Sequence, residues 1–303
     1  MNLQQRAEAF IKLGKEISFF LEGKNKNPLL NSSLIESCRQ NGWFTEDNVR
    51  FSLGAISEEL SEKKIHQWLK KYPSPNFHPP HTVRVIIPSN IPLAGFHDFF
   101  CVLMSGNIFL GKCSARDNIL LPAIANVLIS LVPEFKKYIF FSDDFSKRLQ
   151  FDALIATGSN NSSRYFEYYF GKYPHIIRKN RNSVGILAGK ESNEELLLLG
   201  NDIFRYFGMG CRNVSKIFVP ENYDFNLFFK GIFGWNEIIN HNKYANNYTY
   251  NKAILLMNKI KILDNGFVLL KQDDGISSPV SVIYYDYYYN LINLKKEITL
   301  KKK

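Results

Sequence analysis

Apolar and polar positions along this chain repeat in two rhythms, one typical of helices and the other of strands. Residues 3–21 place apolar side chains at helical spacing, which predicts an amphipathic helix. A loop rich in Asn, Gly and Pro is expected at 23–31, and a second helical region is expected to begin after Thr45, whose hydroxyl suits an N-cap. The proline-rich stretch 72–80 then predicts a linker that leads out of this N-terminal helical segment.

Beyond that linker, short β-branched runs alternate with longer runs of helical period. Such β–α alternation is typical of a mostly parallel sheet that binds ligands at the carboxyl ends of its strands. The expected fold class is therefore α/β. Strands are predicted at 83–87, 107–112, 138–141, 153–156, 183–187 and 280–285, and helices at 97–105, 120–131 and 194–206.

The formal net charge of +10 raises the question of a nucleic-acid partner. The tail 295–303 holds five lysines and one glutamate, so +4 of that charge lies in the tail and the rest is dispersed. A dispersed charge favours a solvated basic surface over a nucleic-acid groove, although part of it could meet an anionic cofactor or a coenzyme A substrate. We therefore expect no nucleic-acid partner.

Length and cysteine content fit a globular enzyme. The 303 residues are enough for two ordinary domains. The four cysteines, Cys38, Cys101, Cys113 and Cys211, form no CxxC pair and show no spacing with histidine that suggests zinc, so no metal site is predicted. Without a signal peptide they are expected to be reduced thiols of a cytoplasmic protein. No apolar run approaches the roughly twenty residues that span a bilayer, so no membrane span is predicted.

The stretch 207–216 is the most informative part of the sequence, because Cys211 follows Gly210 in a turn between a helical run and a strand-like run. A turn exposes the sulfur, and a small neighbour lets a substrate approach closely. A thiolate attacks carbonyl carbon, which suits an oxidoreductase that handles aldehydes or thioesters. The alternative is a small buried cysteine with no chemical role.

Three further candidates follow predicted strands. The turn Thr157-Gly158-Ser159 could direct backbone N–H groups at a cofactor phosphate, although it is not a complete dinucleotide fingerprint. Asn90, in a proline-bracketed turn, could donate to a developing oxyanion or serve the turn alone. Lys112 ends a predicted strand, where it could meet a ribose or phosphate or remain a surface lysine.

The order and separation of these motifs resemble those of the aldehyde dehydrogenase superfamily, with its proline–Trp–Asn turn, its GN…K strand, its TGS turn and its catalytic cysteine. More closely, the chain resembles the bacterial acyl-CoA reductase family, which is related to the fatty-acid reductase subunit of bacterial luminescence. The resemblance extends from residue 1 to about residue 285. It rests on the stretches 91–98, 156–182, 204–216 and 240–248.

The resemblance implies an aldehyde-dehydrogenase-like fold, with a helical segment and an NADP-binding Rossmann-type domain at 1–182 and a catalytic domain at 183–303. It implies that Cys211 accepts the acyl group, and that Asn90 and the backbone N–H of Cys211 form an oxyanion hole. Lys112 and the 157–159 turn would hold the cofactor. The activity implied is the reduction of an acyl-CoA substrate to an aldehyde with NADPH.

Three stretches depart from the superfamily's pattern. The strand that carries the general-base glutamate of hydrolytic members corresponds to 176–180, which holds no carboxylate, so reduction is favoured over oxidation to an acid. The superfamily's later glutamate has Asp273 or Asp274 as its nearest counterpart. After about residue 285 the chain turns to tyrosines and lysines, which predicts a C-terminus shorter than that of the family.

Two other functions stay open at this point. One is the reduction of another activated acid, such as an acyl phosphate, and the other is cofactor binding without turnover in a shortened family member. The sequence alone indicates neither the length of the acyl chain nor the choice of NADP over NAD. A homo-oligomer or a partner acyl-transferase is also left open.

Overall fold

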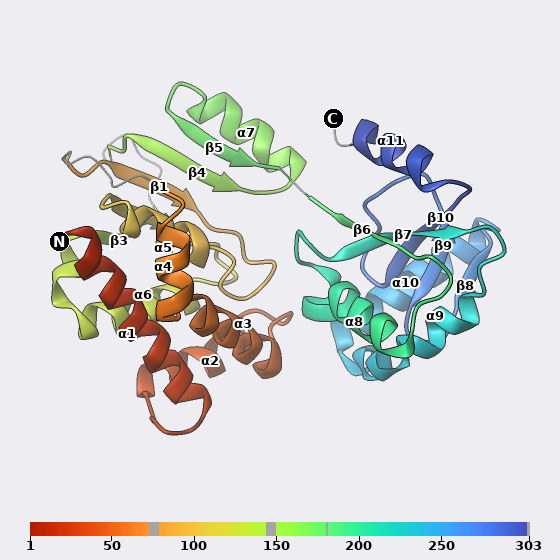
Figure 1. Ribbon diagram of the computed structural model, residues 1–303, viewed down its shortest axis with the longest axis horizontal. Helices are drawn as coiled ribbons and strands as arrows, with labels where there is room; N and C mark the ends of the chain where they lie inside the picture. Colours follow the sequence, from red (N-terminus) through yellow and green to blue (C-terminus); the bar gives the residue numbers. More distant parts are fainter. Residues whose placement is uncertain (73–78, 144–149, 180, 302–303) are drawn as a thin grey trace. The chain divides into compact units, whose positions relative to one another are not determined.

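The computed structural model describes residues 1–72, 79–143, 150–179 and 181–301. The chain divides into two compact units, Met1–Asn180 and Arg181–Lys303 (Figure 1). This division falls two residues before the domain boundary predicted from the sequence. Most of the linker predicted at 72–80 lies outside the described residues.

The first unit begins with four helices whose starts are set by capping side chains. Asn2 and Gln5 form a capping box, and the Thr45 hydroxyl accepts a hydrogen bond from the Asn48 N–H, which confirms Thr45 as an N-cap. The loop predicted at 23–31 is wrong in part, because a helix begins at Pro28, a residue suited to the first helical position. The helices are α1 (Leu3–Leu21), α2 (Pro28–Gln40), α3 (Glu46–Glu59) and α4 (Glu62–Leu69).

A five-stranded parallel sheet follows, in the order β3-β2-β1-β4-β5. This is the order of a doubly wound Rossmann-type sheet, in which the chain winds one way from the centre and then the other. The strands are β1 (Thr82–Ile86), β2 (Ile108–Lys112), β3 (Ile139–Phe141), β4 (Ala153–Thr157) and β5 (His175–Arg178). They are connected by α5 (Phe96–Met104), α6 (Leu120–Leu131), the short helix η1 (Pro133–Lys137) and α7 (Asn160–Phe170).

The sheet has a helix layer on each face. Val83, Val85 and Phe109 point into a large core that α1, α5 and α6 complete, while α7 covers the opposite face beside β4 and β5 (Figure 1). The opposite placement follows from right-handed crossovers that run in opposite directions along the sheet. The carboxyl ends of β1 and β4, where the winding direction changes, therefore flank the crevice in which such folds bind ligands.

The second unit is also α/β. Its sheet has the order β6-β7-β10-β9-β8, and all its pairs are parallel except the one between β8 and β9. Its strands are β6 (Ser183–Ile186), β7 (Val214–Pro220), β8 (Ile262–Asp264), β9 (Leu269–Gln272) and β10 (Val282–Tyr288). Its helices are α8 (Asn193–Phe204), η2 (Arg205–Gly208), α9 (Phe225–Gly231), η3 (Phe233–Asn240), α10 (Asn242–Met257) and α11 (Leu291–Lys301).

The predicted α/β fold class is confirmed by both units. Within the described residues, no helix is both long and apolar enough to cross a membrane.

Candidate functional site

The first unit brings most of the predicted site residues to one edge of its sheet. Lys112 ends β2, Thr157 ends β4, and Asn90 lies in the turn that follows β1. Because β2, β1 and β4 are neighbours and run parallel, their carboxyl ends lie at the same edge. Cys211 belongs to the second unit and is described separately below.

The turn around Asn90 is held from outside by the N-terminal helical segment. The buried Asn41 side chain donates to the Ser89 carbonyl at 3.0 Å, and the buried Ser52 hydroxyl donates to the Pro92 carbonyl at 3.0 Å. Sequence analysis missed both residues, although a buried Ser on the apolar face of a helix is a signal that could have been used. Asn90 is half-buried within a turn whose two flanking carbonyls are fixed.

Lys112 lies at the end of β2 with a half-buried side chain. Its Nζ donates to the Asp143 carbonyl at 3.3 Å. Register pairs Lys112 with Ile86 of β1, and Ile86 with Ala156 of β4, so these three side chains lie on one face of the sheet. That face is the one α7 covers, which puts the Lys112 ammonium on the same side of the sheet as the N-terminus of α7.

The Gly158-Ser159 turn connects β4 directly to α7. A Cβ on Gly158 would lie 2.9 Å from the Ser162 Cβ and 3.1 Å from the Phe166 ring, so the close approach of α7 requires glycine. The Ser159 hydroxyl caps α7 by accepting from the Ser162 N–H at 3.2 Å. An anion could therefore meet the N–H groups of Asn160 and Asn161, for which a helix supplies no internal acceptor.

The structure differs from the prediction at the backbone N–H of Gly158. The Gly158 N–H donates to the Arg178 carbonyl at 3.2 Å, so it is engaged in the sheet and does not point at a ligand. An anion at this turn would therefore have to be bound by the helix that begins at Asn160.

Cys211 lies in a turn whose backbone is held in an uncommon conformation. Tyr206, Phe207 and Gly208 have φ angles of 55°, 59° and 73°, so three successive residues adopt the left-handed region. This conformation costs energy for the two residues that carry a Cβ and persists only where the surroundings fix it. The Cys211 side chain is exposed, as a nucleophile requires, and the alternative of a buried cysteine does not apply to it.

Asn213 fixes this turn, and sequence analysis missed it. Its buried side chain accepts from the Gly210 N–H at 2.7 Å and donates to the carbonyls of Asp202 and Arg205 at 2.7 and 3.0 Å. Its own N–H donates to the Gly210 carbonyl at 3.0 Å. One amide therefore satisfies carbonyls at the end of α8 and closes the loop that presents Cys211.

A small cavity of about 60 Å³ lies next to this turn within the second unit. Phe207, Gly208, Val214 and Tyr244 contribute to its lining, together with the segment 278–283. The Tyr244 hydroxyl donates to the Phe267 carbonyl at 3.0 Å, and burial raises the pKa of this tyrosine well above its ordinary value. Tyr244 therefore contributes no negative charge to this wall at neutral pH.

Asp273, one of the two predicted counterparts of the later glutamate, is engaged in a loop. Its carboxylate accepts from Lys271 at 2.5 Å and from the Gly275 N–H at 2.8 Å. The hydrogen bond from Lys271 holds the pKa of this carboxyl below its usual value. Lys216, which is completely buried, donates to the Asp273 carbonyl at 2.6 Å and lies 3.6 Å from Asp286.

β5 contains residues 176–178 of the stretch that the resemblance aligns with the superfamily's general-base position. Among the described residues at 176–179 there is no carboxylate, and Asn180 lies outside the description. Arg178 instead donates to the Asp98 carboxylate at 2.7 Å.

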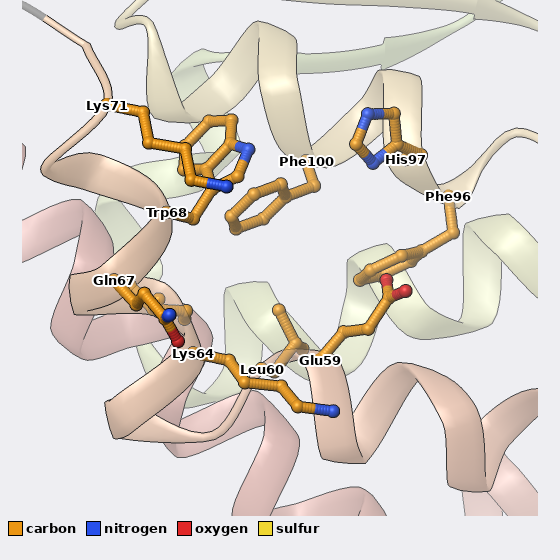
Figure 2. A pocket seen from close by; sticks show the side chains of 10 residues that line it. Glu59, Leu60, Lys64, Gln67, Trp68, Lys71, Phe96, His97 and Phe100 are labelled. Carbon is orange, nitrogen blue, oxygen red and sulfur yellow. The ribbon is translucent and has the colours of Figure 1, made fainter.

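A separate pocket of about 340 Å³ lies between α3, α4 and α5. Trp68, Phe96 and Phe100 form much of its apolar wall, with Lys71 and His97 at its rim (Figure 2). None of the predicted site residues lines it, so it is not part of the crevice described above.

The structure of this chain is similar to solved structures. No family model matches the chain, and no curated protein sequence matches it. Solved structures match over 98–99% of the chain at low sequence identity. A putative aldehyde dehydrogenase from Burkholderia cenocepacia is 12% identical with a TM-score of 0.71, and 72% of its own chain is covered. For aldehyde dehydrogenase 21 from Physcomitrella patens the identity is 14%, the TM-score 0.70 and the covered share 71%.

The chain has the aldehyde dehydrogenase fold. An aldehyde dehydrogenase from Bacillus cereus, solved as its NAD+ complex, shares this fold at 15% identity with a TM-score of 0.69 over 98% of this chain and 69% of that one. The fold expected from the sequence is thereby confirmed. At such low sequence identity, the structural matches establish the fold and do not identify a substrate.

Proposed function

We propose that this protein reduces an acyl-CoA thioester to an aldehyde with NADPH, through a thioester formed on Cys211. The observation that carries the proposal is the exposed Cys211 side chain on a turn fixed by Asn213, in a chain with the aldehyde dehydrogenase fold. The resemblance to acyl-CoA reductases supplies the substrate class.

The nucleophile in this proposal is the Cys211 thiolate. Its sulfur attacks the carbonyl carbon of the acyl-CoA, a new S–C bond forms, and the carbonyl oxygen becomes an oxyanion. When the oxyanion collapses, the C–S bond to coenzyme A breaks, and the leaving thiolate takes a proton from water. The acyl group then remains on Cys211 as a thioester.

The developing oxyanion needs hydrogen-bond donors that are already in position. We assign this role to the backbone N–H of Cys211 and to the side-chain amide of Asn90. The hydrogen bonds from Asn41 and Ser52 to the carbonyls on either side of Asn90 support this assignment, because they fix the turn before substrate arrives.

Lys112 and the 157–159 turn are the residues we expect to hold the cofactor. Their fit is supported by the glycine at 158, where a Cβ would clash with α7, and by the N-terminus of α7. When bound, the nicotinamide cofactor supplies the hydride that converts the thioester on Cys211 to aldehyde and free thiolate. Solved neighbours of this fold bind NAD+, and the choice of NADPH rests on the resemblance alone.

The residues of β5 favour reduction of the thioester over its oxidation to an acid. Oxidation to an acid requires a base that activates water against the acyl-enzyme. Arg178, paired with Asp98, occupies the strand where hydrolytic members of the superfamily carry a glutamate. A chain with no carboxylate at 176–179 is suited to hold the thioester until it is reduced.

Intact mass spectrometry tests the proposal most directly. Purified protein is mixed with a long-chain acyl-CoA in the absence of cofactor, using wild type, Cys211→Ala and Cys38→Ala. Wild type and Cys38→Ala should gain one acyl group and release one coenzyme A, whereas Cys211→Ala should gain none. NADPH should then remove the acyl group as aldehyde.

The alternatives give different results in the same experiment. An adduct formed from an acyl phosphate but not from acyl-CoA would favour the reductase of another activated acid. Tight cofactor binding without any adduct would favour a protein that binds cofactor and does not turn over. An adduct that persists in Cys211→Ala would overturn the assignment of the nucleophile.

A further inference from the structure

The Asp98–Arg178 ion pair joins the first turn of α5 to the end of β5. Asp98 is buried, with 8% of its surface exposed, and its Oδ2 accepts from Arg178 Nη1 at 2.7 Å. A buried carboxylate needs a partner, because an unpaired charge away from water is strongly unfavourable. The two residues are 80 positions apart in the chain, so the pair joins distant segments.

On one side, Asp98 belongs to the helix that follows the Asn90 turn. It lies in the first turn of α5, whose N-cap is Gly95. A Cβ on Gly95 would lie 2.7 Å from the Ile87 side chain, so the start of α5 is pressed onto the end of β1. Asp98 therefore lies in a helical turn that packs tightly against the end of β1.

On the other side, Arg178 supports the Gly158 turn. Register pairs Arg178 with Thr157, and the Arg178 carbonyl accepts from the Gly158 N–H at 3.2 Å. In-register side chains lie on the same face of a sheet, so the Thr157 side chain lies on the face that α5 covers, as Arg178 does. The backbone of Arg178 thus accepts from the Gly158 turn, while its guanidinium donates to Asp98.

The ion pair connects two elements that are not adjacent in the sheet. In the order β3-β2-β1-β4-β5, α5 connects β1 to β2 and Arg178 ends β5, so the ion pair reaches across β4. It links the two oppositely wound halves at the point where their carboxyl ends separate. We infer that Asp98 and Arg178 are positioning residues that hold the Gly158 turn at the spacing the cofactor requires.

This inference rests on the proposed function for the identity of the cofactor and for the assignment of the Gly158 turn to its binding. Neither residue needs to touch substrate, and neither belongs to the set assigned to the chemistry. Loss of the link should therefore weaken cofactor binding and leave acylation of Cys211 unchanged.

The test measures the Kd for NADPH and for NADH, the KM for NADPH, and acyl-enzyme formation by intact mass. The variants are Asp98→Asn, Arg178→Gln and the double variant, in which two neutral amides can still form a hydrogen bond. Lys179→Gln is the matched control, since it removes the neighbouring cation, whose partner Glu167 lies 3.1 Å away on the surface. Melting temperature is recorded for each protein.

We expect each single variant to raise the cofactor Kd and KM about tenfold, roughly 1.4 kcal/mol of binding energy. The double variant should bind no more weakly than either single variant, because both changes break the same link. Acylation of Cys211 and the behaviour of Lys179→Gln should match wild type.

Variants that melt earlier but bind cofactor as wild type does, at temperatures where they are folded, would overturn the inference. Those results would show that the pair serves stability alone. Failure of the proposed function looks different, because wild type itself would then form no acyl-enzyme or bind neither cofactor.

Discussion

The side chain of Asn213 accepts a hydrogen bond from the Gly210 N–H at 2.7 Å, and this contact closes the loop that presents Cys211. The same amide donates to carbonyls at the end of α8. The position of the cysteine therefore depends on a residue two positions along the chain whose own side chain is buried.

Replacement of Asn213 by alanine should destabilise the protein by about 1–3 kcal/mol, because it leaves buried backbone groups without their partner. It should also slow acylation of Cys211, since the turn would no longer be fixed. Thermal unfolding and the rate of acyl adduct formation measure the two effects. Asn226→Ala, which removes an exposed Asn side chain near the start of α9, is the control and should change neither. An acylation rate unchanged in folded Asn213→Ala would show that the turn needs no such support.

Substitution of Gly158 by alanine should weaken cofactor binding and cost about 1–3 kcal/mol of stability, as overpacking does. The new Cβ would lie 2.9 Å from the Ser162 Cβ and force α7 away from β4. Calorimetric titration with NADPH measures the loss. Gly54→Ala is the matched control, because its Cβ would meet only Leu21 at 3.7 Å within a helix. That variant should be more stable than wild type by about 0.5–1 kcal/mol, with unchanged cofactor affinity.

Thiol labelling at pH 8 should modify Cys211 well before Cys101 or Cys113. Burial raises the pKa of Cys101 to about 11 and that of Cys113 to about 12, so both remain protonated thiols at this pH. The thiolate is the species that reacts, and Cys211 is the exposed one of the three. Peptide mapping after a short pulse of iodoacetamide measures the order. Rapid labelling of Cys113 in the folded protein would contradict it.

The loop at Asp273 should lose support in acid. The hydrogen bond from Lys271 depresses the folded-state pKa of Asp273 below its ordinary value of 3.8. A depressed carboxyl pKa stabilises the fold above the unfolded-state value, and this contribution disappears as the pH falls through the folded-state pKa. Wild type should therefore melt higher than Asp273→Asn at pH 7, and the difference should shrink below about pH 4. A difference that is constant from pH 7 to pH 3 would show that charge plays no part.

Local signals predicted the first unit well, because its strands and helices carry clear periodicity. Thr45 was identified as a cap from its side chain, and the strands that end near Lys112 and Thr157 were placed within a residue or two. The local pattern predicted no strand between residues 156 and 183, although β5 lies there. This strand has exposed Ile176 and a paired Arg178, so its stability comes from pairing with β4 and its local pattern is weak.

The supporting residues of the site were beyond sequence analysis for a physical reason. Asn41, Asp98 and Asn213 act through partners that are distant in the chain or contact the backbone, and neither kind of partner leaves a local pattern. The catalytic candidate Cys211 could be proposed because glycine neighbours and a turn are local features. Its relation to Asn90 rests on the resemblance, since the two residues belong to different units.

The adjacency of β1 and β4 has a consequence for synthesis of the chain. Residues 82–86 leave the ribosome long before residues 153–157, yet the two strands pair from Val83 with Ala153 to Ile86 with Ala156. Until β4 arrives, one edge of the central strand β1 is an open template for wrong partners. We expect nascent chains arrested at about residue 150 to bind chaperones more strongly than chains arrested after residue 180, which cross-linking of ribosome-bound chains can measure. The carboxyl edge of this sheet, where we propose that the cofactor binds, is thus completed late, by the last strands of its own unit.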